Sequence, residues 1–345
     1  MTYLKWLARL DRYLLLLIGT VALAAILPAY GIGARIVDLA VPGGIGLLFF
    51  LYGVRLAPAA VVEGLMHWRL QTLVFGSSFV LFPVVGLVVT RVFGRWLDPA
   101  LVTGILFVCL LPSTVQSSIA FTSIARGNVP AALCSASVSN LLGIVATPVL
   151  VAVLLRGSGA GLSASALEDI ALQIVLPFVL GQMARPFIGA WVLRHKRVTS
   201  VVDRGSILLV VYAAFSAGMV EGIWRQVDLA SLAIVLVADL TILAAVLLAT
   251  TLVSRASGFS KEDEIAIVFC GSKKGMASGI SMANILFPAS SVGLVVLPLM
   301  LFHQAQLFAC AALAQRYARR LPAPTSPGAV NVSAPRPTAA QMTAR

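Results

Sequence analysis

The sequence predicts an all-α polytopic membrane protein with about ten transmembrane helices in two inverted five-helix repeats. Hydrophobic residues make up 59% of the chain and charged residues only 11%, and the mean hydropathy is +0.98. The apolar runs exceed what one soluble core could bury, so lipid must solvate much of the surface. The fourth and ninth apolar runs are interrupted at corresponding places, which favours an inverted repeat.

Each apolar run of sufficient length is a candidate membrane span. The first run follows Lys5, Arg9 and Arg12, and it is long for a signal peptide and has no clear cleavage site, so we expect a retained helix. The spans are expected at about residues 12–30, 40–57, 68–93, 98–125, 129–154, 167–188, 204–222, 228–254, 263–287 and 291–316.

The chain carries a formal charge of +12. Its basic residues flank apolar runs and form no stripe, so they indicate how the spans are oriented in the membrane, and we expect no nucleic-acid partner. Most of these basic residues fall on the side of the N-terminus, and an even number of spans then places both termini in the cytoplasm. We therefore expect an integral protein of the inner membrane. Residues 1–320 form the membrane domain, and 321–345, rich in Pro, Ala, Ser and Thr, form a disordered cytoplasmic tail.

Five helices in each half would invert the second repeat, at about 167–316, relative to the first, at about 12–154. The fourth span is interrupted at 111–118 and the ninth at 270–279. Paired breaks of this kind indicate a binding site near the middle of the membrane, where backbone groups and half-helix ends are free to meet a solute or an ion.

The break in the fourth span carries a dense polar cluster after Pro112. Any one of these side chains could bond its own helix backbone, but so many together favour a lined cavity. Asn140 in the fifth span could face this cavity across the hairpin. The cluster consists of Ser113, Thr114, Gln116, Ser117 and Ser118.

The ninth span places Lys273 and Lys274 near the membrane centre, where a charge is costly and usually functional. Asp239 in the eighth span lies at a similar depth and needs a partner, for which either lysine is a candidate. The pair is either a static link between helices or a charge relay and substrate counter-ion. Ser272 and Ser278 flank the lysines, and glycines spaced by four indicate close helix packing as well as a weakened helix.

The tenth span adds His303 and Gln304, with Gln306 close by. His303 either titrates near neutral pH or is a hydrogen-bonded structural histidine. The four cysteines form no CxxC pair, so we expect no disulfide framework and no protein-bound metal centre. The sequence has no HExxH, Walker A or GxGxxG motif, and no Ser-His-Asp order, so we do not expect an enzyme.

Several stretches of the chain together match a family pattern, in order. They are 112–118, 143–148, 176–182, 258–260, 267–274 and 297–299. In these stretches the sequence resembles the bile acid:sodium symporter superfamily, in the branch that contains the vertebrate solute carrier family 10 member 7 and related bacterial transporters. The resemblance covers about residues 12–320. It implies a core domain and a panel domain (segments 1, 2, 6 and 7), with broken helices 4 and 9 crossing.

The resemblance also shows where this chain departs from the bile acid transporters. Phe269 stands at the position of their ligating Glu, Lys273 and Lys274 replace an amide pair, and Ser118 replaces an Asn. A lysine ammonium would repel sodium and could substitute for its charge. We therefore expect sodium coupling to be lost or altered, with any remaining sodium near Ser117 and Ser118.

The sequence thus predicts a secondary active transporter of a small organic anion or amphipathic solute that works by alternating access. Lys273 and Lys274 would supply positive charge, with Asp239 as counter-ion, and sodium or a proton would be the coupling ion. One alternative is a proton-coupled exchanger that uses an Asp239–lysine pair. Another is a non-transporting membrane regulator. The oligomeric state is left open.

Overall fold

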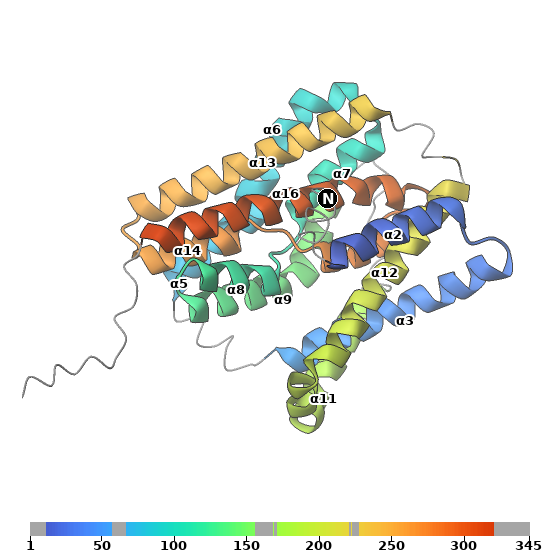
Figure 1. Ribbon diagram of the computed structural model, residues 1–345, viewed down its shortest axis with the longest axis horizontal. Coiled ribbons are helices and arrows are strands. Elements are labelled where there is room, and N and C mark those ends of the chain that lie inside the picture. The colour runs from blue at the N-terminus through green and yellow to red at the C-terminus, as the bar shows by residue number, and fades with distance from the viewer. Residues whose placement is uncertain are drawn as a thin grey trace, which may run out of the picture.

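Long apolar helices make up the described part of the chain (Figure 1). A computed structural model describes residues 12–56, 67–155, 168, 171–220, 222 and 228–320. Within these residues, seven helices are long and apolar enough to span a membrane, or eight when one bent pair counts as a span. The fold is therefore that of an all-helical polytopic membrane protein.

The helices follow the expected spans closely in most of the chain. Elements labelled α are α-helices; of the short turns labelled η, η1 (77–81) and η3 (171–175) are π-helical and η2 (94–96) is a 3-10 turn. The elements are α2 (Arg12–Ile26), α3 (Ile32–Arg55), α5 (Trp68–Gly76), η1 (Ser77–Leu81), α6 (Phe82–Phe93), η2 (Gly94–Trp96), α7 (Pro99–Leu110), α8 (Val115–Ile124), α9 (Val129–Leu154), η3 (Ala171–Val175), α11 (Leu176–Arg194), α12 (Lys196–Val220), α13 (Leu229–Ala256), α14 (Lys261–Gly271), α15 (Met276–Leu286) and α16 (Ala289–Arg320).

Two helices begin eight residues earlier than expected, in each case where charged residues limit the apolar run but not the helix. Helix α3 begins at Ile32 and continues through Pro42, although Arg35 and Asp38 interrupt the apolar pattern there. Helix α12 begins at Lys196, directly after α11, because lysine and arginine favour helix even where they end the apolar run. The predictions for residues 1–11 and for the tail 321–345 lie outside the described residues.

Several helix starts are fixed by capping side chains. Asp98 accepts a hydrogen bond from the amide of Ala100 at the start of α7, and Asn128 accepts one from Ala131 at the start of α9. Ser260 and Asp228 cap α14 and α13 in the same way. Hydrogen bonds from Ser231 hold the pKa of the Asp228 carboxyl below its usual value. These caps set where each span enters.

The helices divide into two groups (Figure 1). Helices α2, α3, α11 and α12 pack on one another, and the helices from α5 to α9 and from α13 to α16 pack together beside them. Helices α3 and α11 cross very closely. The evidence is that a Cβ on Gly53 would collide with the carbonyl of Phe178, and a Cβ on Gly181 with the carbonyl of Phe50. Glycine at both positions brings these backbones together.

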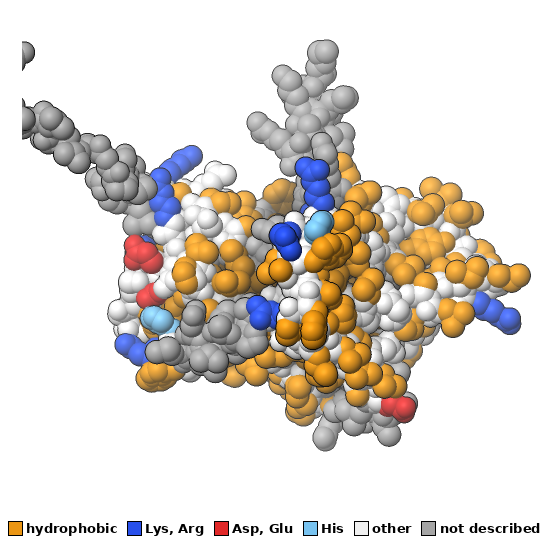
Figure 2. All heavy atoms as spheres, turned by 90° about the horizontal axis from the view of Figure 1, so that it is seen from below, with side chains coloured by type: hydrophobic (Ala, Val, Ile, Leu, Met, Phe, Trp, Pro, Cys, Tyr) orange, Lys and Arg blue, Asp and Glu red, His pale blue; other side chains and the backbone are white. Residues whose placement is uncertain are grey.

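The face of the molecule in Figure 2 carries many apolar side chains. Large apolar side chains such as Val88, Val145, Phe187 and Leu248 are exposed on helices that would face lipid. A soluble monomer rarely exposes apolar surface on this scale, so these side chains indicate contact with the bilayer.

The buried Glu264 holds three helices together at one end of the molecule. It accepts hydrogen bonds from Arg255 of α13, Lys261 of α14 and Tyr317 of α16.

Candidate functional site

The two predicted interruptions meet in space. Helix α7 ends at Leu110 and α8 starts at Val115 at an angle of 61°. Helix α14 ends at Gly271 and α15 starts at Met276. The amide of Gly275 donates a hydrogen bond of 2.9 Å to the carbonyl of Pro112, so one break is bonded to the other. Four half-helices therefore converge at one crossing.

Three carbonyls at the end of α7 accept hydrogen bonds from side chains of other elements. The hydroxyl of Thr147 donates to Leu110 O at 2.8 Å. The ammonium of Lys274 donates to Cys109 O at 3.0 Å, to Leu111 O at 2.6 Å and to Ser78 O in η1 at 2.9 Å. A helix end leaves its last carbonyls without internal partners, and here a fully buried lysine serves two of them.

The end of α14 is capped in a similar way by side chains from other elements. Ser118 donates to Phe269 O at 3.2 Å, and Ser77 donates to Gly271 O at 2.7 Å. The side chain of Gln306 bonds both the amide and the carbonyl of Lys274, each at 2.9 Å. The amide nitrogen of Gln306 also lies 2.8 Å from Nδ1 of His303. These bonds hold the broken segment in one conformation.

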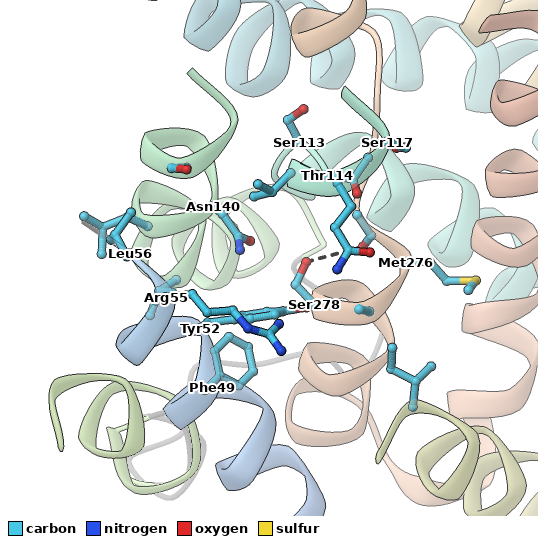
Figure 3. Close-up of a pocket in the computed structure, with 18 of the residues that line it drawn as sticks. Phe49, Tyr52, Arg55, Leu56, Ser113, Thr114, Ser117, Asn140, Met276 and Ser278 are labelled. Atoms are coloured by element: carbon cyan, nitrogen blue, oxygen red, sulfur yellow. Dashed lines mark hydrogen bonds between the residues drawn. The ribbon is translucent and has the colours of Figure 1, made fainter. Parts of the chain in front are cut away.

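A cavity of about 400 Å³ lies between the two helix groups at this crossing (Figure 3). One side is lined by Phe49, Tyr52 and Arg55 of α3, which Figure 3 labels. Arg204 of α12 is a lining residue as well. The opposite side contains the first turns of α8 and α15. The lining residues there are Ser113, Thr114, Val115, Gln116, Ser117, Gly275, Met276, Ala277 and Ser278, with Asn140 from α9 and His303 from α16.

The cavity contains about half of the residues that the sequence singled out. Seven line it: Ser113, Thr114, Gln116, Ser117, Asn140, Ser278 and His303. Five are buried outside the lining: Ser118, Asp239, Ser272, Lys273 and Lys274. Gln304 is half-buried and does not line the cavity either. Neither lysine therefore lines this cavity, and the expectation that they supply positive charge to the substrate or coupling site stays a prediction.

The expected ion pair between Asp239 and a lysine is not present among the described contacts. Lys274 bonds three carbonyls instead, and the ammonium of Lys273 lies 3.8 Å from the centre of the Phe121 ring without a hydrogen bond within the described residues. Both carboxyl oxygens of Asp239 are buried and have no partner in that same part of the chain.

Sequence reasoning missed the two arginines that line the cavity. Arg55 ends α3 and Arg204 lies near the start of α12, so both were read only as topology signals. A usable signal was present in α3, where Phe49, Tyr52 and Arg55 are spaced by three residues and so share one helix face. An arginine on the same face as two aromatic residues differs from an isolated flanking charge.

Comparison with known proteins identifies the family. The family model of the SBF-like CPA transporter family matches residues 11–319. The chain belongs to this family. It is therefore a membrane transporter and not an enzyme, and the resemblance to the bile acid:sodium symporter superfamily is confirmed.

Similar proteins carry related names. "Uncharacterized protein PA2026" of Pseudomonas aeruginosa is 55% identical over 311 residues, which is 90% of this chain and 93% of that protein. "Putative symporter YfeH" of Escherichia coli is 49% identical over 315 residues, 90% of this chain and 94% of its own. "Sodium/bile acid cotransporter 7" of Mus musculus is 28% identical over 267 residues, 76% of this chain and 78% of that one.

Sodium, which appears in the name of the Mus musculus relative, does not fit among the backbone carbonyls that surround Lys274 in this chain. A sodium ion prefers several oxygen ligands. The backbone oxygens that converge there, from Ser78, Cys109 and Leu111, already accept hydrogen bonds from the Lys274 ammonium. A second cation in this place would meet a fixed positive charge at close range.

Proposed function

We propose that this transporter carries a small organic anion or amphipathic solute by alternating access, and that the solute binds in the cavity at the crossing. The observation that carries the proposal is the charge of the cavity wall. Arg55 and Arg204 line it, and no Asp or Glu is found among its described lining residues. Two guanidinium groups in a site between two helix groups favour an anion over a cation or a neutral sugar.

The backbone adds to this positive charge. The first turns of α8 and α15 both line the cavity, so the positive ends of two half-helix dipoles point toward it. Half-helix N-termini at a membrane midplane bind anionic groups in other secondary transporters. Together with the arginines, they would hold a carboxylate, sulfate or phosphate group without any contribution from Lys273 or Lys274.

The rest of the cavity wall favours an amphipathic solute. Its apolar surface comes from Phe49, Leu141, Ile144, Phe178 and Leu307. A volume of about 400 Å³ lies in the ordinary range for pockets that enclose a small organic molecule. The proposed solute therefore has one anionic end for the arginines and an apolar body of modest size.

The proposed mechanism uses the two helix groups as moving parts. In this proposal, ten spans form two inverted repeats, at about 12–154 and 167–316, and α2, α3, α11 and α12 form the panel that moves against the core. The paired breaks, and the packing of α3 on α11 and of α2 on α12, support it. With both termini in the cytoplasm of the inner membrane, Arg55 and Arg204 lie on the cytoplasmic side, and the cavity faces inward.

A second candidate is proton-coupled transport, which the environment of Asp239 favours. Its two carboxyl oxygens are buried without a hydrogen-bond partner among the described residues. A lone carboxyl inside a membrane protein commonly belongs to a proton or ion pathway. Binding and release of a proton at Asp239 would couple solute movement to the proton gradient.

The test measures solute binding and flux with matched arginine variants. Purified protein is screened by thermal stabilisation against organic anions, cations and neutral solutes, and hits are tested for uptake into proteoliposomes. We expect anions to stabilise the wild type, and Arg55→Gln and Arg204→Gln to bind each hit at least tenfold more weakly. Arg194→Gln removes a similar charge outside the cavity and should bind normally.

Two results would overturn the proposal. One is selective stabilisation by cations or neutral solutes, which the wall charge does not predict. The other is binding without flux in proteoliposomes, which would favour a non-transporting regulator. Equal affinity in Arg194→Gln and the two cavity variants would show that the arginines do not contact the solute.

A further inference from the structure

We infer that the ammonium of Lys274 fills a monovalent-cation site built from backbone carbonyls, so that the protein supplies its own cation at the helix crossing. The inference concerns Lys274 alone and not its neighbour. It is independent of which solute the cavity binds, because the lysine does not line that cavity.

The geometry around the nitrogen is that of a coordinated cation. Its three oxygen partners are Leu111 O at 2.6 Å, Ser78 O at 2.9 Å and Cys109 O at 3.0 Å. An ammonium has three donors and a neutral amine only two, so three carbonyl partners fit the charged form. The Phe82 ring covers a further side, with its centre 4.0 Å from the nitrogen.

The three carbonyls are available because regular helix hydrogen bonding stops at each of them. Cys109 and Leu111 lie at the end of α7, where the last carbonyls lack internal partners and carry the negative end of the helix dipole. Ser78 lies in the π-helical turn η1, whose altered bonding pattern releases a carbonyl. Three buried acceptors facing one point require either a cation or several donors.

Backbone carbonyls arranged in this way can replace the hydration shell of an alkali cation, as they do in potassium-selective filters. In this chain the position is occupied by a side chain that cannot leave. The charge at the crossing therefore stays constant during a transport cycle, and a sodium gradient cannot be coupled at this point. Removal of the side chain should leave an empty site with affinity for free Na⁺, K⁺ or NH₄⁺.

Lys273 provides the matched control, since it is adjacent, equally buried and of the same chemistry. Its ammonium faces the rings of Phe121 and Phe269 and makes no hydrogen bond within the described residues. No carbonyl set would be exposed by its removal. Any cation effect that depends on the carbonyls should therefore appear on substitution of Lys274 and not on substitution of Lys273.

The experiment measures the melting temperature of the purified full chain in detergent, without any solute. Wild type, Lys274→Ala and Lys273→Ala are compared in NaCl, KCl, NH₄Cl and N-methyl-D-glucamine chloride at constant ionic strength. We expect the wild type and Lys273→Ala to respond equally to all four salts. Lys274→Ala should melt lower in the large organic cation, and the small cations should restore about 2–4 °C or more.

A second variant keeps the test decisive if Lys274→Ala does not fold in the organic cation. Lys274→Gln keeps most of the side-chain volume and leaves at least one carbonyl free, so it should fold and still respond to small cations. The inference is wrong if neither Lys274 variant distinguishes small cations from the organic one, or if Lys273→Ala gains the same response to small cations as Lys274→Ala. Neither result depends on transport, so a failure here leaves the proposed anion cavity standing.

Discussion

The amide of Gly275 donates a hydrogen bond of 2.9 Å to the carbonyl of Pro112, and this bond joins the breaks of two interrupted helices. The two residues are far apart in the sequence and belong to different halves of the chain. Their contact fixes the ends of four half-helices around one point. It also places the first turns of α8 and α15 on the same cavity wall.

Packing is tight around Pro112, beside the cavity, which gives the first prediction. A Cβ on Gly143 in α9 would lie 2.5 Å from the Pro112 ring, and a proline ring cannot move aside easily. We expect Gly143→Ala to destabilise the protein by about 1–3 kcal/mol, as overpacking does in other cores. Gly205→Ala is the control, because a Cβ there meets nothing within 4 Å. An unchanged melting temperature for Gly143→Ala would show that the crossing can relax.

The sequence located the breaks because their signals are local. Pro112 cannot continue a helix, and a buried lysine pair among glycines is incompatible with an ordinary span. It could not show which of the polar residues face the cavity. Ser117 and Ser118 are chemically identical neighbours, and only the position of α14 decides that Ser118 bonds Phe269 O while Ser117 lines the cavity.

The roles of the charged residues were harder to predict for the same reason. The sequence predicts that Lys274 supplies positive charge to a substrate or coupling site, because a midplane charge is usually functional. The structure gives it to carbonyls of α7 and η1, which lie more than a hundred residues earlier in the chain. Arg55 was read as a flanking charge, since nothing in α3 alone shows that Arg204 and the broken helices surround the same space.

The adjacent serines separate solute binding from stability. The hydroxyl of Ser117 has no hydrogen-bond partner within the described residues, whereas Ser118 donates to Phe269 O. We expect Ser117→Ala to keep the melting temperature and to weaken solute binding by about fivefold, the loss of roughly 1 kcal/mol. Ser118→Ala should instead lower the stability by about 1 kcal/mol or more. The reverse pattern in thermal melts and binding titrations would contradict this assignment.

The adjacent lysines should differ in the same manner when each is replaced by methionine. Lys273→Met exchanges a buried ammonium without a described hydrogen bond for an apolar chain of similar length, so we expect unchanged or higher stability. Lys274→Met leaves three buried carbonyls without their donor, and each such group costs about 1–3 kcal/mol. Thermal melts of the two variants should therefore move apart. Equal losses would mean that Lys273 has a structural partner of its own.

Asp239 offers the sharpest test of proton coupling. Asn has nearly the same shape as Asp but cannot exchange a proton, so Asp239→Asn should fold normally and lose the acceleration of uptake by an imposed pH gradient. Its stability should stay the same or rise slightly, because no described hydrogen bond is lost and a buried ionisable group is removed. The measurement is solute uptake into proteoliposomes with and without an inward proton gradient, with Asp98→Asn as a control at a helix cap outside the cavity. If Asp239→Asn still responds to the gradient as the wild type does, the proton pathway does not pass through this carboxyl, and the anion cavity operates without it.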